Sequence, residues 1–69
     1  MSHPVQLPQK FGRMVEWLNG RQHIVTDADE HHYLTPGWNA APGAKPGDRI
    51  QLEYRATRGL GLWYGKVAP

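Results

Sequence analysis

The sequence predicts an all-β fold, a small barrel of five short strands in a single domain. Runs rich in Val, Ile, Tyr and Trp are separated by closely spaced turn residues, so no interval is long enough for a helix. One run, DRIQLEYRA, alternates between apolar and polar residues, as a half-buried strand does. A chain of 69 residues buries only about 60% of the surface that its unfolded form exposes, which excludes a large enzyme core.

The domain is expected to span residues 10–69, preceded by a flexible arm over residues 1–9. The arm, MSHPVQLPQ, holds two prolines and no periodic pattern. No apolar run approaches the roughly 20 residues that span a bilayer, and the first residues lack the order of a signal peptide. With no cysteine, disulfides and thiolate metal sites are excluded. We therefore expect a soluble, cytoplasmic protein without a membrane partner.

The first two strands are FGRMVEWL and RQHIVTD, joined by Asn19-Gly20, a strong hairpin signal. Under strict alternation Val15 and Trp17 share a face. An outward Trp17 beside a buried Val15 therefore requires a β-bulge, and without a bulge Trp17 belongs to the core.

The third strand, HHYLTP, ends at a proline, and the loop that follows has room for one helical turn. KPGD is a turn that begins the fourth strand, whose core face carries Ile50, Leu52, Tyr54 and Ala56. In the fifth strand, LGLWYGKV, alternation sends one of Trp63 and Tyr64 to the core and the other outward. Closing the five strands into a barrel removes exposed sheet edges.

Several patterns in the chain do not indicate catalysis or a cofactor. The spacing of Gly59, Gly61 and Gly65 does not match the dinucleotide fingerprint, so a bend of the barrel is the favoured reason for these glycines. His31 and His32 are adjacent and point to opposite faces, which disfavours a zinc site. No nucleophile and base have matching spacing. We expect no enzyme activity, metal or cofactor.

The charge is unevenly distributed, although its sum is only +2. An acidic cluster of Asp27, Asp29 and Glu30 lies mid-chain. After Glu53 the chain carries cations only, namely Arg55, Arg58 and Lys66. The sum is too small to indicate nucleic acid by itself, so the distribution matters more, and either a nucleic-acid surface or a solvated loop tip followed by an ordinary basic strand accounts for it.

The stretches GRMVEWLNG, HIVTDADEHHYL and PGDRIQLEYRATRGLGLWYGKV resemble the cold-shock domain. Val15, Trp17, Leu18 and Asn19 look like its first-strand V-K-W-F-N pattern, with Glu16 in place of the usual lysine. The resemblance implies an oligonucleotide-binding (OB) barrel that holds single-stranded RNA or DNA. The glycine- and phenylalanine-rich first motif of the family is replaced by Arg21 to Ile24, and the chain is also similar to other small OB branches, such as translation-initiation and ribosomal S1-type modules.

Single-strand binding needs aromatic faces for the bases and cations for the phosphates. We expect Trp17, Tyr33 and the outward ring of the fifth strand to share one surface, joined by His23. The predicted site residues are Trp17, His23, Tyr33, Trp63 and Tyr64, with Arg13, Arg21, Arg55, Arg58 and Lys66 at the rim.

A protein-interaction module on an OB or SH3-like barrel, such as a phage- or plasmid-encoded adaptor or inhibitor, is the alternative, because Trp and Tyr also dominate protein interfaces. The position of the acids discriminates between the two functions. Acids on the aromatic face would repel phosphates, whereas acids on the far side would leave the nucleic-acid hypothesis intact. The oligomeric state stays open.

Overall fold

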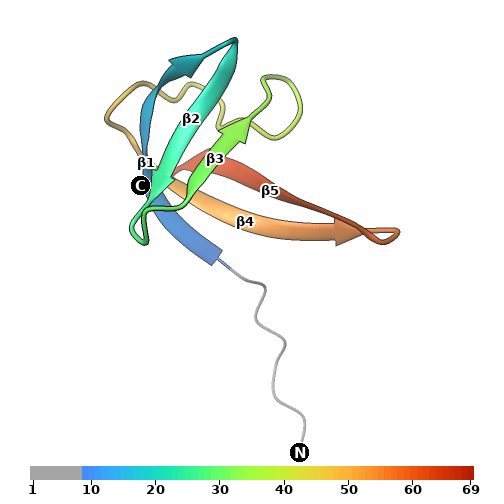
Figure 1. Cartoon of the computed structure of the whole chain (residues 1–69). Coiled ribbons are helices and arrows are strands. Elements are labelled where there is room, and N and C mark those ends of the chain that lie inside the picture. Colours follow the sequence, from blue (N-terminus) through green and yellow to red (C-terminus); the bar gives the residue numbers. More distant parts are fainter. Residues whose placement is uncertain (1–8) are drawn as a thin grey trace, which may run out of the picture.

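The computed structural model describes residues 9–69 as one antiparallel sheet in the order β3-β2-β1-β4-β5 (Figure 1). The strands are β1 (Gln9–Leu18), β2 (Arg21–Thr26), β3 (His31–Leu34), β4 (Arg49–Thr57) and β5 (Leu60–Val67). The all-β class and all five predicted strands are confirmed. The arm predicted for residues 1–9 lies outside the described residues except for Gln9, which is the first residue of β1. The described chain contains no helix that could cross a membrane.

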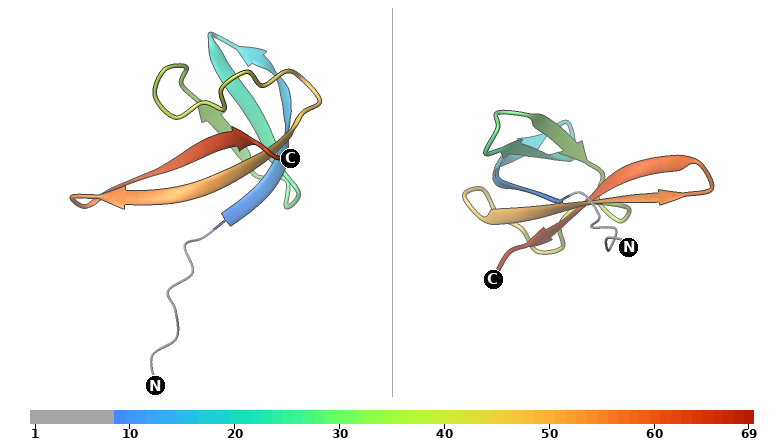
Figure 2. Two further views of the ribbon diagram at one scale, coloured as in Figure 1. Left: turned by 180° about the vertical axis from the view of Figure 1, so that it is seen from behind. Right: turned by 90° about the horizontal axis from the view of Figure 1, so that it is seen from below.

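The sheet curls because β1 is shared by its two halves. The first half of β1 pairs with β4 and the second half with β2, and Gly12 and Arg13 pair with both. A β-carbon at Gly12 would lie 2.5 Å from the carbonyl oxygen of Val25, so only glycine fits where the two ladders meet. The result is a half-barrel, with the β4–β5 hairpin extending beyond the body (Figures 1 and 2).

The open seam between β3 and β5 is bridged by the β3–β4 loop. The carbonyl of Asn39 accepts a hydrogen bond from the Gly65 N–H (2.9 Å), and its side-chain amide donates to the carbonyl of Trp63 (2.8 Å). Asn39 Oδ1 also accepts from the Thr35 N–H (2.7 Å). The sheet itself is not closed into a barrel, since no strand pairs with the outer edge of β5 within residues 9–69, and only the loop spans the seam.

The core lies inside the curl of the sheet. Strand residues contribute its largest side chains, Met14, Ile24, Leu34, Ile50 and Leu52, and the loop adds Ala41 and Ala44. The predicted alternation of β4 is confirmed at Ile50 and Leu52. Tyr54 is only half-buried and Ala56 is exposed, because this part of β4 belongs to the projecting hairpin.

The turns follow the sequence signals. Asn19 and Gly20 both have positive φ angles (50° and 76°), and so do Arg58 and Gly59 (53° and 80°). Two such residues in succession match the right-handed twist of a hairpin.

The bulge considered for β1 is present between Met14 and Glu16, but its effect differs from the expectation. Val15 is exposed (47%) rather than buried. The extra residue brings Trp17 to the same side of the sheet as Met14, because Trp17 pairs with Gln22 and Met14 with Ile24. Trp17 is nevertheless 48% exposed, since it lies at the open end of the half-barrel.

Replacing Asn39, which is only 6% exposed, tests the importance of the loop bridge. Asn39→Ala should destabilise the fold by about 1–3 kcal/mol, because the carbonyl of Trp63 and the N–H of Thr35 would lose their partners. The shift of the urea unfolding midpoint measures this loss. Lys45→Ala in the same loop removes an exposed side chain and should leave the midpoint nearly unchanged. Equal midpoints for the two variants would contradict the bridging role.

Candidate nucleic-acid interface

A groove of about 410 Å³ runs along the outer face of the projecting hairpin, which we call the hairpin groove. Its lining combines aromatic, aliphatic and cationic side chains with one bare stretch of backbone. These residues are Trp38, Arg55, Arg58, Leu60, Gly61, Leu62 and Tyr64. Its two cations lie on β4 and on the hairpin turn, and Trp38 reaches it from the β3–β4 loop.

Strand alternation positions the side chains of the hairpin groove. Leu60, Leu62 and Tyr64 point outward from β5, and Arg55 lies opposite Leu62 on β4. The guanidinium of Arg55 lies over the Tyr64 ring, 4.7 Å from its centroid. Leu60 (78% exposed) lies at the tip of the hairpin.

Trp38 is the most exposed aromatic side chain among the described residues, at 68%. The backbone on either side of it is held, because the carbonyl of Thr35 accepts hydrogen bonds from the N–H groups of Trp38 and Asn39 (3.1 Å each). An exposed indole on a held backbone, beside two guanidinium groups, can stack on a base while the cations meet phosphates. Glu53 lies opposite Tyr64 and 3.5 Å from Arg55, so it offsets part of the charge at one end.

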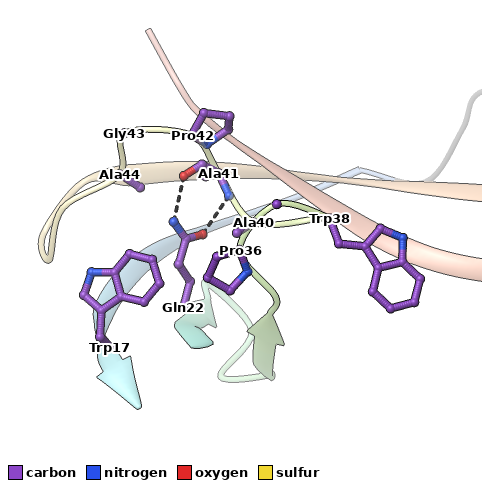
Figure 3. A pocket seen from close by; sticks show the side chains of 10 residues that line it. Trp17, Gln22, Pro36, Trp38, Ala40, Ala41, Pro42, Gly43 and Ala44 are labelled. Atoms are coloured by element: carbon purple, nitrogen blue, oxygen red, sulfur yellow. Dashed lines mark hydrogen bonds between the residues drawn. The ribbon is translucent and has the colours of Figure 1, made fainter. Parts of the chain in front are cut away.

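A second hollow of about 500 Å³, the Trp17 cleft, lies between the open end of β1 and the β3–β4 loop (Figure 3). Trp17 lies at one end of this cleft and Trp38 at the other, with Pro36 and Pro42 along its walls. The amide of buried Gln22 donates to the carbonyl of Ala41 and accepts from its N–H, both at 2.7 Å. These bonds hold the loop at a fixed distance from the sheet.

The rings of Tyr33 and His23 lie on the opposite side of the sheet from Trp17. They stack with centroids 4.7 Å apart and an interplanar angle of 17°. The prediction that Trp17 and Tyr33 share one surface is therefore wrong, because Trp17 is in register with Gln22 whereas Tyr33 is in register with His23.

The stacked pair belongs to a polar cluster that the sequence did not reveal. His23 Nε2 lies 2.9 Å from Nδ1 of His31, and a carboxylate oxygen of Glu16 lies 3.7 Å from Nδ1 of His23. His23 is only 9% exposed. The carboxylate of Glu16 disfavours a phosphate on this face.

Trp63 and Tyr64 point to opposite sides, which confirms the predicted split. Trp63 packs against the core, with its ring 5.2 Å from that of Tyr54 and 5.7 Å from that of His32. The ammonium of Lys10 lies 4.7 Å from the Trp63 centroid. Because its ring is already covered by these neighbours, Trp63 is not a stacking platform, and Tyr64 is the outward ring of β5.

The acidic cluster lies in the β2–β3 turn, away from the hairpin groove, and most of it is paired. Arg49 donates two hydrogen bonds to Asp27 (2.7 and 2.8 Å), which lower the pKa of that carboxyl. Lys10 likewise donates to Glu30 and lowers its pKa. Asp27, Asp29 and Glu30 are thus segregated from the hairpin groove, whereas Glu16 is not segregated from the Tyr33 face.

The structure distributes the predicted cations over several surfaces. Arg55 and Arg58 join Tyr64 in the hairpin groove, and Arg21 lies beside Tyr33 and Leu18. Arg13 is exposed beside the turn that holds Asp27, and Lys66 is exposed near the end of β5 without lining the hairpin groove. In the part of the chain that the structure describes, no three His, Asp or Glu side chains converge as metal ligands.

The residues of the groove that the sequence did not single out are Trp38, Leu60 and Leu62. One feature of the sequence indicates that Trp38 is exposed. It is a lone indole in a loop rich in Pro, Gly and Ala, where no strand face exists to bury it.

The need for Gly61 arises from a close approach, rather than from the bend of the barrel that was expected. A β-carbon there would lie 1.4 Å from the hydroxyl oxygen of Tyr54, whose ring covers this part of β5. Gly61→Ala should destabilise the fold by about 1 kcal/mol, because the half-buried ring of Tyr54 must move aside. In a Tyr54→Ala background the same change should cost less than about 0.5 kcal/mol, which a double-mutant cycle of urea midpoints measures. An equal destabilisation by Gly61→Ala in both backgrounds would contradict the view that the Tyr54 ring excludes a side chain at this position.

The stability of the fold should also depend on His32. Burial lowers the pKa of His32 below its ordinary value of 6.5, and nearby Lys10 lowers it further, whereas Glu30 opposes the shift. The folded state therefore favours the neutral ring, so stability is complete above pH 6.5 and declines as the pH falls through the folded-state pKa.

His32→Phe keeps an aromatic ring beside Trp63 and should remove part of the stability loss on acidification. Urea midpoints between pH 7.5 and 5, compared with wild type, provide the measurement. Parallel pH dependences in the two proteins would refute the role of His32.

Comparison of the chain with protein-family models, with curated proteins and with solved structures gives no match. The similarity to the cold-shock domain therefore depends only on the sequence stretches quoted above. The fold is established as a small all-β half-barrel, and its function is inferred from the geometry of the hairpin groove and the surfaces around it.

Proposed function

We propose that this protein binds single-stranded nucleic acid, RNA or DNA, through the hairpin groove. The observation that carries the proposal is the convergence of an exposed indole, an outward tyrosine ring and two arginines on one projecting hairpin. Base stacking on an aromatic ring contributes about 1–3 kcal/mol per base and tolerates any sequence. Arginine adds both phosphate contact and cation–π attraction.

The distribution of the acids supports the same proposal. Asp27, Asp29 and Glu30 lie in the β2–β3 turn, and two of the three are paired with cations. The groove lining contains no acid within the described residues, although Glu53 is close by. OB barrels bind oligonucleotides on a strand face and on the loops around it, and a groove formed by a hairpin and a loop is consistent with that general mode.

A protein-interaction module is the second proposal, and the free edge of β5 favours it. Among the described strands none pairs with this edge, and only Asn39 hydrogen-bonds to it there. An extended peptide could add to such an edge as a further strand. The carboxylate of Glu16 on the Tyr33 face also fits a protein partner better than a phosphate.

Fluorescence titration with oligo-dT and with single-stranded RNA of about eight nucleotides tests the first proposal. Binding should quench tryptophan emission, because exposed Trp38 lines the hairpin groove. The logarithm of the association constant should fall with log salt by about 0.7 per phosphate contact.

Charge and ring variants then assign the binding to the hairpin groove. Joint replacement Arg55→Ala and Arg58→Ala should flatten the salt dependence, and Trp38→Ala should weaken binding about tenfold. Arg13→Ala removes one cation outside the groove and is the matched control. Absence of quenching at low salt would contradict nucleic-acid binding. Equal losses of affinity in the groove variants and in the control would contradict the assignment of binding to the hairpin groove.

A further inference from the structure

Two hollows of the surface meet at Trp38, which borders both the hairpin groove and the Trp17 cleft. Figure 3 shows Trp17 at one end of the cleft and Trp38 at the other, with its indole directed toward β5. We infer that a single strand bound in the hairpin groove continues past Trp38 into the Trp17 cleft. The inference rests on the proposed function and extends it, because it defines a binding track with three successive rings, those of Tyr64, Trp38 and Trp17.

The Trp17 cleft is suited to a base rather than to a phosphate. Its described lining contains no charged side chain and consists mainly of Pro, Gly, Ala and the two indoles. The one polar side chain, Gln22, has both ends of its amide engaged by the backbone of Ala41. Gln22 is also only 1% exposed, so its amide is hardly accessible to a base edge, and the cleft would hold a base by stacking and apolar contact, without regard to sequence.

The geometry of the track is fixed before a ligand binds. The β3–β4 loop is held on the cleft side by the Gln22–Ala41 bonds and on the hairpin side by the bonds from Asn39 to β5. Trp38 directly precedes Asn39, and its own N–H donates to the carbonyl of Thr35. The backbone that carries the Trp38 indole is therefore held before a ligand binds, which lowers the entropic cost of ordering the site.

The two ends of the track differ in charge. Arg55 and Arg58 lie only at the hairpin end, so the phosphates held there determine the salt dependence. A base in the Trp17 cleft adds affinity without making the association constant fall more steeply with salt. The gain in affinity with a longer strand should therefore be separable from the salt dependence of binding.

Binding of end-labelled oligo-dT of about four and about eight nucleotides, followed by fluorescence anisotropy, tests the track. Wild type should prefer the longer strand. Trp17→Ala should weaken binding of the longer strand about tenfold and leave the shorter strand and the salt slope unchanged. Trp17→Phe should restore most of the affinity. Leu18→Ala, the adjacent residue on the opposite face, is the matched control, and urea midpoints verify that each variant is folded.

Each alternative outcome has a distinct meaning. If Trp17→Ala binds the longer strand as tightly as wild type, the track is wrong while the proposed function stands. Equal losses for both lengths would place Trp17 in the primary site and would also overturn the track. If no oligonucleotide binds the wild type, the proposed function fails and the track fails with it.

Discussion

The β3–β4 loop holds together the two edges that the sheet leaves apart. A five-stranded sheet with β3 and β5 at its edges would expose two rows of unpaired peptide groups. Asn39 satisfies part of one row with both its backbone and its side chain, and Gln22 holds the same loop from the interior. Because polar bonds in a buried setting are costly to lose, these few contacts fix the loop firmly. The position of Trp38 relative to Tyr64 and Trp17 depends on them.

The electrostatic character of the surface follows from local pairing rather than from the net charge of +2. Two salt bridges pair Asp27 and Glu30 of the acidic turn, and they engage the cations Arg49 and Lys10. Arg58, at the tip of the hairpin, is far from that turn along the sheet. A weakly charged protein can therefore present one small cationic aromatic surface, provided that its acids are paired elsewhere.

The features that could be predicted from the sequence are those governed by neighbouring residues. Alternation in DRIQLEYRA and the Asn19-Gly20 turn depend on local geometry, and the turn and the strand boundaries, to within about two residues, agree with the structure. Alternation likewise separated Trp63 from Tyr64. The position of Trp38 could not be predicted, because it depends on hydrogen bonds between residues more than twenty positions apart. The face of Trp17 was predicted wrongly relative to Tyr33, because register across three strands has no local signal.

The unpaired residue in β1 has a consequence for the interior of the protein. In a regular ladder continued from Met14, Glu16 would point into the half-barrel and the indole of Trp17 would point away from it. Glu16 would then stand opposite Gln22, at the open end of the half-barrel, and would lose its place beside His23. By adding one residue, β1 exchanges the two: the carboxylate stays in solvent, and the mouth of the interior gains an aromatic wall. The number of residues before the first hairpin, as well as their chemical identity, thus decides which side chain borders the open end of the fold.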